Sequence, residues 1–454
     1  MLAISSSIGA MFSLTSAFTA LVSAGYVFGY QLAFSLSAGA TCGLLVLLRL
    51  SRRSLVTDFL TSTQANGWSA GASYLTLLSA YFSRTAYLLY YAFAMVVYLG
   101  LTITEFAVFR VTLEALAPSL ATPEIVLIIS MTLLICFSYV FIGGYRGGLI
   151  TDYFQLAIIF LFLGSLMREF KISSFILHLP SPMGGKVLTG SIPELILLHF
   201  GSFVGGFAAA LFSIDQWYRT LGTLPLSRAR KVLITGIILI CLGSLVPILI
   251  GSYALNLSNM PVRLANTIST HLLINLLNTK NQTVRFLFFM TLAAVVLTTL
   301  DTYLITLQQL YYEFSIRFRA SSSRTYILEY LTKWRNVRLV GFIMGVISFL
   351  ASFFVANDSI YLFGVGALAA VIFLSPVLII PLFSPTKPLP EWYPWASLIA
   401  SVAIYWPLVY FFARLTGPVS IHLYIIAAAA GVASFFVNGT FLAIWRIKHA
   451  KYRP

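Results

Sequence analysis

Adjacent threonines and two aspartates inside apolar stretches are the residues of this chain best suited to binding chemistry. Thr298 and Thr299 lie in a leucine- and valine-rich run, and Asp301 follows Thr298 at a spacing that puts both on one face of a helix. Asp152 lies in another apolar stretch, where an ionised side chain costs roughly 2.5–3.5 kcal/mol and is usually kept for function. Hydroxyl and carboxylate oxygens suit small hard cations such as sodium, so these residues are candidate cation ligands.

Each of these residues also has a structural interpretation. A threonine in a membrane helix can bond to the carbonyl four residues earlier. Thr298 and Thr299 point about 100° apart, so both reach one ion only if it lies in a crevice beside the helix. Asp152 follows a pair of glycines and could cap the start of a helix. Asp301 could be an accessory cation ligand or gate, or an ion-pair partner, and spacing leaves these alternatives open.

Membrane helices are the elements that must position these groups. Apolar residues make up 59% of the 454 residues and charged residues 9%, which is too little polarity to cover a water-facing surface. We therefore expect an all-α integral membrane protein in the lipid bilayer with about 12 transmembrane helices. The expected helices are 3–27, 30–50, a long helix ending near 116, 123–142, 147–167, 191–213, 232–255, 285–314, 338–355, 359–384, 393–413 and 420–445.

The distribution of Lys and Arg predicts the orientation. If alternate connections lie on opposite sides, twenty of the 28 basic residues collect on one side and eight on the other. Cytoplasmic loops retain Lys and Arg, so we expect both termini in the cytoplasm and the chain in the plasma (cell inner) membrane. A separate crossing at 68–82 would reverse this bias downstream. We therefore interpret that segment as interfacial or as an early start of the third helix.

The net charge of +15 does not indicate nucleic-acid binding. The excess lies in loops beside helix ends, where it sets orientation and touches anionic lipid head groups. The three cysteines, Cys42, Cys136 and Cys241, lie in apolar runs, which favours packing over disulfides or metal binding. The chain begins apolar without a charged leader, so we interpret its start as the first helix and not as a signal peptide.

Three short stretches carry a family resemblance. Residues 143–155 read GGYRGGLITDYFQ, residues 215–221 read DQWYRTL with RARK following at 228–231, and residues 298–304 read TTLDTYL. In this order they resemble the Gly-Gly…Thr-Asp-x-x-Gln, Gln…Gln-Arg-x-Leu-Ala and Ser-Thr-x-Asp-Ser-x-Leu motifs of the sodium/solute symporter family. The resemblance extends over about 5–385, and it identifies the chain as a compact, divergent member.

The resemblance implies a five-plus-five inverted-repeat transporter core. In such folds the first and sixth core helices are broken, and substrate and cations bind where the backbone is unwound. We expect this core at 1–385, followed at 386–454 by two additional transmembrane helices and a basic cytoplasmic tail. Most family members have a further helix before the first core helix, for which we expect no room here, so either the carrier is compact or its N-terminus is incomplete.

The resemblance also implies ligands. The implied sodium ligands are the hydroxyls of Thr298 and Thr299, the carbonyl of Val295, carbonyls near Ala10 and Ser13, and Asp152 as a further ligand. Hydroxyls on the first helix and polar groups on the sixth suit a substrate lining of Thr15, Ser16, His199 and Ser202. His199 is equally compatible with a single internal hydrogen bond.

Taken together, these observations favour sodium-coupled symport of a small organic solute by alternating access. Sodium is the expected coupling ion, with no organic cofactor. The alternatives are a proton-coupled symporter and a transporter-fold sensor or receptor without net transport, whereas an enzyme would need a clustered set of acids or metal ligands. The expected partners are the solute and the bilayer, with a homo-oligomer left open.

Overall fold

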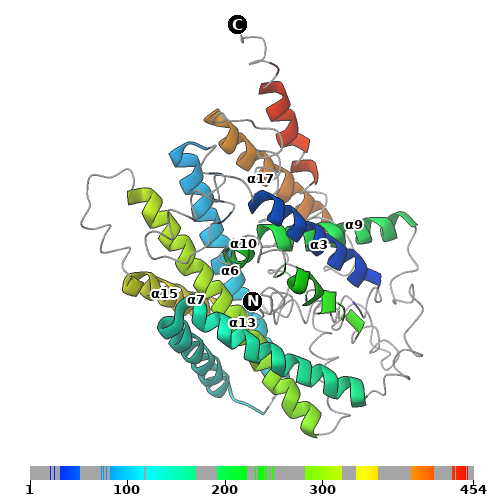
Figure 1. The fold of residues 1–454 in the computed structure, drawn as a ribbon, viewed down its shortest axis with the longest axis vertical. Helices are drawn as coiled ribbons and strands as arrows, with labels where there is room; N and C mark the ends of the chain where they lie inside the picture. The colour runs from blue at the N-terminus through cyan, green and yellow to red at the C-terminus, as the bar shows by residue number, and fades with distance from the viewer. Residues whose placement is uncertain are drawn as a thin grey trace.

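The computed structural model describes residues 31–51, 82–116, 119–169, 192–221, 282–319, 334–355 and 390–413, much of 231–249 and 432–447, and a few isolated residues. The longer elements in these ranges are all α-helices (Figure 1). They are α3 (Gln31–Ser51), α6 (Arg84–Leu116), α7 (Thr122–Glu169), α9 (Ile192–Phe212), α10 (Ile214–Leu221), α13 (Gln282–Arg319), α15 (Trp334–Ser352) and α17 (Trp392–Ala413).

Several of these helices have the length and composition of membrane spans. Within the described residues three qualify outright, namely Arg84–Glu114, Thr122–Gly144 and Phe286–Ser315. Shorter apolar helices occur at Phe34–Arg49, Ile150–Phe162, Asn336–Ser352 and Val432–Trp445. The predicted all-α membrane architecture is confirmed. The total of 12 crossings stays a prediction, because the expected helix at 359–384 and all of 3–27 except Leu21 and Gly25 lie outside the described residues.

The first half of α7 is apolar on two opposite faces. Ile129 and Leu133 are buried against the protein, whereas Leu127, Leu134 and Ile142 expose between 54% and 79% of their surface. A helix of a water-soluble protein would carry polar residues on its outer face. The outward apolar stripe therefore indicates a lipid-facing surface.

Helix α13 occupies the centre of the helices that it contacts. It packs against α6, α7 and α15, and every residue from Thr298 to Leu310 is buried. A helix that is buried on all sides usually carries apolar residues alone. Here the buried stretch includes three further threonines, an aspartate and two glutamines, so polar groups are concentrated in the interior.

Helices α3 and α9 touch backbone to backbone. A Cβ atom added to Gly206 would lie 2.2 Å from the carbonyl oxygen of Leu36, and one added to Gly39 would lie 1.9 Å from that of Phe203. Both distances are far below a van der Waals contact, so only glycine permits this approach. The resemblance led us to expect an unwound sixth helix, but residues 192–212 are helical throughout, and the interruption lies at Ser213 before α10.

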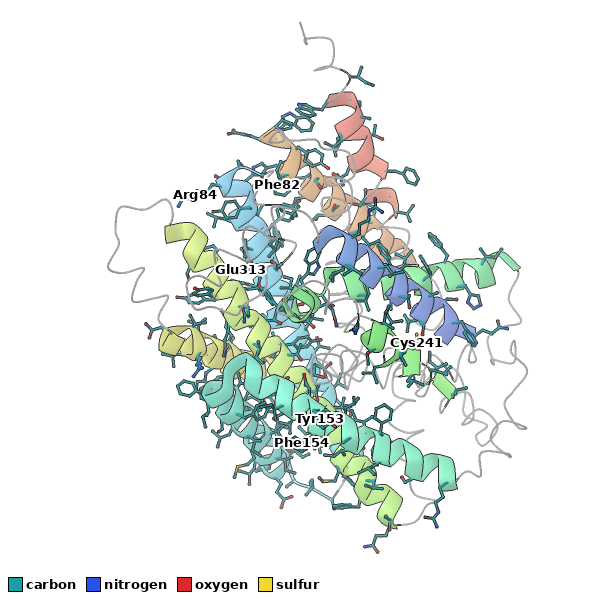
Figure 2. The ribbon with its side chains drawn as sticks, in the orientation of Figure 1. Phe82, Arg84, Tyr153, Phe154, Cys241 and Glu313 are labelled. Atoms are coloured by element: carbon teal, nitrogen blue, oxygen red, sulfur yellow. The ribbon has the colours of Figure 1, made fainter. Side chains whose placement is uncertain are left out.

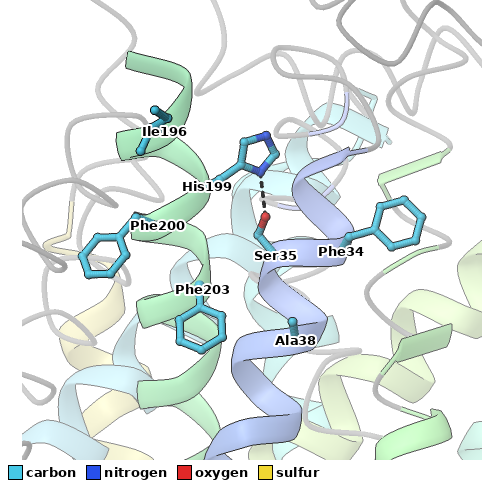
Figure 3. A pocket seen from close by; sticks show the side chains of 7 residues that line it. All are labelled: Phe34, Ser35, Ala38, Ile196, His199, Phe200 and Phe203. Atoms are coloured by element: carbon cyan, nitrogen blue, oxygen red, sulfur yellow. Dashed lines mark hydrogen bonds between the residues drawn. The ribbon is translucent and has the colours of Figure 1, made fainter. Parts of the chain in front are cut away.

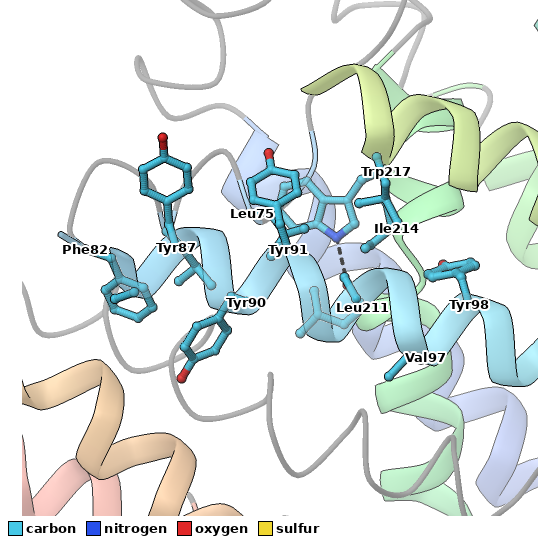
Figure 4. Close-up of a cluster of buried hydrophobic side chains, with 14 of the residues drawn as sticks. Leu75, Phe82, Tyr87, Tyr90, Tyr91, Val97, Tyr98, Leu211, Ile214 and Trp217 are labelled. Atoms are coloured by element: carbon cyan, nitrogen blue, oxygen red, sulfur yellow. Dashed lines mark hydrogen bonds between the residues drawn. The ribbon is translucent and has the colours of Figure 1, made fainter. Parts of the chain in front are cut away.

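An aromatic cluster joins α6 to α10 (Figure 4). Tyr91 and Tyr98 of α6 lie in the same buried cluster as Trp217 of α10, whose indole nitrogen donates to the carbonyl of Leu211 at 2.7 Å. Most of 68–82 lies outside the described residues. Of that segment, Leu75 is helical and 1% exposed within this cluster, and the choice between an interfacial segment and an early start of the third helix stays a prediction.

Candidate cation site

A bend in α7 determines which of its side chains face α13. Gly144 has φ +52° and ψ −140°, a conformation outside the helical region, and the second half of the helix continues beyond it to Glu169. Asp152 therefore lies two turns inside a helix, and the interpretation of this residue as a helix cap is wrong. Its neighbours Tyr153 and Phe154 point outward, 48% and 64% exposed (Figure 2).

Asp152 and Gln155 lie on the opposite, buried face of α7. They are 1% and 6% exposed, and their spacing of three residues places them on one side of the helix. Across from them on α13, Thr298 is 1% exposed, and its hydroxyl contacts the side-chain amide oxygen of Gln155. The same hydroxyl donates to the carbonyl of Ala294 at 2.8 Å.

Asp301 forms the second part of this arrangement. Its carboxylate is fully buried, and Oδ2 accepts hydrogen bonds from the Tyr139 hydroxyl at 2.9 Å and the Thr151 hydroxyl at 3.2 Å. Oδ1 lies 3.3 Å from the hydroxyl of Thr302. Three hydroxyl groups thus surround one carboxylate in an interior without bulk water, where such donors offset the cost of burying the charge.

We call these groups together the α7–α13 polar cluster: Tyr139, Thr151, Asp152 and Gln155 from α7, with Thr298, Asp301 and Thr302 from α13. Its two carboxylates are brought near each other by Thr151, which adjoins Asp152 in the chain and bonds to Asp301 Oδ2 at 3.2 Å. Apart from the side-chain nitrogen of Gln155, the polar side-chain atoms of the cluster are oxygens. A hard cation is the ligand that suits such a set.

The paired threonines make the back-bonds that sequence reasoning offered as their structural alternative. Thr299 donates to the carbonyl of Val295 at 2.9 Å, as Thr298 does to that of Ala294. A hydroxyl that donates its proton keeps its lone pairs, and a carbonyl oxygen that accepts one bond keeps a second acceptor site. Back-bonding is therefore compatible with coordination by Thr298, Thr299 and Val295.

One of the predicted substrate-lining residues, His199, lies away from this cluster. His199 lies at the contact of α3 and α9, where its Nδ1 is 2.6 Å from the hydroxyl of Ser35 (Figure 3). The two line a mainly apolar groove of about 610 Å³ with Phe34, Ala38, Ile196, Phe200 and Phe203. Ser202 is fully buried. Ala10, Ser13, Thr15 and Ser16 lie outside the described residues.

Sequence reasoning missed part of the cluster. Gln155 and Thr151 stand inside the quoted GGYRGGLITDYFQ stretch, and the three-residue spacing of Asp152 and Gln155 could have identified the glutamine. Tyr139 gives no such signal, because its hydroxyl meets Asp301 only through the packing of α7 on α13. Glu313 is also buried without having been singled out.

Glu313 belongs to a separate polar group at the far end of α13. Its Oε2 accepts a hydrogen bond from the Ser73 hydroxyl at 3.1 Å and another from the Tyr91 hydroxyl. On α10, Asp215 accepts a bond from Tyr98 at 2.8 Å. Fifteen residues separate Thr298 from Glu313, which is about 22 Å along a helix, so this group is distinct from the α7–α13 polar cluster.

Comparison with known proteins identifies the fold. No protein-family profile and no curated protein sequence matches the chain. Among solved structures, a Na+-coupled sialic acid symporter in a substrate-bound outward-open state has a TM-score of 0.62 and 15% sequence identity over 97% of this chain and 89% of its own. A nucleobase-cation-symport-1 family transporter, closed with bromovinylhydantoin bound, has a TM-score of 0.55 and 13% identity over 98% of this chain and 92% of its own.

These similarities cover nearly the whole chain, so the chain shares the all-α fold of these two structures. At 15% identity and below they establish the fold and leave the ion and the solute to be argued from the residues of this chain.

Proposed function

We propose that this protein is a secondary active transporter that couples sodium entry to the symport of a small organic solute by alternating access. The α7–α13 polar cluster is the observation that carries the proposal. Gln155 of α7 contacts Thr298 of α13, and Asp152 is buried one turn from Gln155, at positions where such groups are costly and are usually kept for ion or substrate pathways. The shared fold with a Na+-coupled symporter supports the same function.

Sodium is the cation that this donor set suits best. We propose that Thr298, Thr299 and Val295 supply oxygens from α13, and that Asp152 supplies the negative charge from α7. Carbonyls near Ala10 and Ser13 would complete the coordination from the first helix. Asp301, already held by three hydroxyls, is proposed as an accessory ligand or gate that shapes the site from its far side.

Two parts of the protein have proposed roles in this scheme. The transporter core is assigned to 1–385, and 386–454 to additional membrane helices with a basic cytoplasmic tail, both termini being cytoplasmic. Solute would bind between the first and sixth helices, beside Thr15, Ser16 and Ser202. His199, bonded to Ser35 in an apolar groove, has the geometry of a packed histidine more than that of a solute contact.

Proton coupling is the second candidate, and a specific contact favours it. Asp301 with Tyr139 and Thr151 forms a buried carboxyl–hydroxyl group of the kind that carries protons in membrane transporters. A sensor with transporter architecture is the third candidate and requires ligand binding without flux.

Flux measurements with the full chain in proteoliposomes separate these functions. The assay imposes a sodium gradient or a pH gradient and follows radiolabelled amino acids, sugars, sialic acid, nucleobases, carboxylates and urea, with protein-free liposomes as control. We expect accumulation of at least one solute that requires the sodium gradient and disappears with a sodium ionophore. Accumulation driven by the pH gradient without sodium would overturn the sodium proposal, and solute binding without flux would favour the sensor.

A further inference from the structure

The bend in α7 is held by a side chain from another helix. A helix that ends leaves its last carbonyls without partners in the same helix, and the non-helical Gly144 ends the first half of α7 in this way. Arg338, in the first two turns of α15, donates from Nη1 to the carbonyl of Phe141. Its guanidinium also lies over the Phe141 ring, 5.7 Å from the centroid.

This contact is well suited to fixing an angle between helices. Arginine presents several donors in a rigid plane, so it fixes direction as well as distance. Its positive charge also meets the negative end of the dipole of residues 122–143. The other nitrogen, Nη2, lies 3.5 Å from the position that a Cβ atom on Gly144 would occupy, so the guanidinium fills the inside of the bend.

The turn after the bend transmits this angle to the cation site. A Cβ atom on Gly148 would lie 2.7 Å from the Ile305 side chain and 3.6 Å from Asp301 Oδ2, so the backbone of α7 is pressed against α13 there. Thr151 bonds to the Gly148 carbonyl at 2.9 Å and to Asp301 at 3.2 Å. Asp152 lies one helical turn beyond Gly148. Any change in the angle of the bend would therefore displace the Asp152 side chain.

From these contacts we propose that Arg338 is a positioning residue for the cation site. It holds the two halves of α7 at the angle that aligns Asp152 and Gln155 with Thr298, and it ties that angle to α15. The inference rests on the proposed function for its effect on sodium. The effect on the bend follows from the contacts alone.

Arg110 provides a matched control. Its guanidinium lies 5.4 Å from the centroid of the Phe353 ring, and its Nη2 donates to the carbonyl of Val355 at 3.3 Å. It thus makes the same kind of contact as Arg338, just beyond the end of α15 and away from the bend. Arg110→Ala removes the same kind of contact, together with an ion pair to Glu114 at 3.7 Å, and controls for loss of stability in general.

The first measurement is the sodium concentration that gives half-maximal uptake. We expect Arg338→Ala to raise it about tenfold, which corresponds to about 1.4 kcal/mol of sodium binding, because the bend is no longer held at the angle that aligns the site. Arg338→Lys, which keeps the charge, should recover part of this loss, and Arg110→Ala should leave the value unchanged. An equal shift in Arg338→Ala and Arg110→Ala would overturn the inference.

The second measurement reads the bend without transport. Spin labels are placed on the exposed positions Leu127 and Leu161, on either side of Gly144, in a chain whose three cysteines are replaced. The control pair, Leu127 and Ile142, lies within the first half. Double electron–electron resonance should show a shifted or broadened distance between Leu127 and Leu161 in Arg338→Ala. The distance between Leu127 and Ile142 should not change.

An unchanged distance across the bend in Arg338→Ala would refute the positioning role, whatever the uptake shows. A wild-type chain whose uptake ignores sodium would instead defeat the proposed function. The inference would then be decided by the distance across the bend alone.

Discussion

Replacing Thr298 by valine tests the cation site most directly. Valine keeps the shape of threonine but removes the hydroxyl that contacts Gln155 and donates to the Ala294 carbonyl. If this oxygen coordinates sodium, its loss removes one charge-assisted contact, worth about 1.5–3 kcal/mol, which corresponds to about a 10- to 100-fold higher sodium concentration at half-maximal uptake. The measurement is sodium-dependent solute uptake in proteoliposomes at saturating solute.

Thr306→Val is the matched control for this substitution. Thr306 is 1% exposed on the same helix, and its hydroxyl donates to the Thr302 carbonyl at 2.8 Å, so the variant loses the same kind of back-bond. We expect it to keep the wild-type sodium dependence. A Thr298→Val protein that folds and shows a sodium requirement within about twofold of wild type, less than 0.5 kcal/mol, would refute the assignment of this hydroxyl as a ligand.

The remaining predictions concern glycines. Gly144→Ala should lower stability by about 1–3 kcal/mol because φ +52° with ψ −140° is strained for any residue with a Cβ atom. Gly143→Ala, which meets no atom within 4 Å, should change stability little, and thermal unfolding in detergent compares the two. Gly206→Ala should force α3 and α9 apart, because the new methyl group would lie 2.2 Å from the Leu36 carbonyl; we expect about 1–3 kcal/mol of destabilisation. Equal melting temperatures for all three variants would contradict both arguments.

Hydropathy and charge predict the class of fold because the bilayer demands long apolar helices. The expected helices at 123–142 and 147–167 correspond closely to the two halves of α7, whose continuity through a bend at Gly144 was not foreseen. A glycine-rich junction reads as a loop or as a bend equally well. What distinguishes them here is Arg338, nearly 200 residues away, which caps the end of the first half.

The candidate site likewise contains some residues that the sequence predicts and others that it does not. Asp152, Thr298 and Asp301 could be found because polar groups in apolar runs are costly and therefore conspicuous. Tyr139 could not, since tyrosines are common in membrane helices and its role depends on facing Asp301 across a helix contact. The sequence also did not predict that the α13 threonines are buried on every side of the helix, because a polar stretch suggests that one face is exposed to water.

The glycine contact between α3 and α9 has a mechanical consequence. With no side-chain layer between the two backbones at Gly39 and Gly206, neither helix can slide or roll past its neighbour without steric overlap. We therefore expect α3 and α9 to move together as a rigid body. If the protein transports a solute as proposed, its large conformational change must separate other helix pairs, and a cross-link joining α3 to α9 should not inhibit uptake.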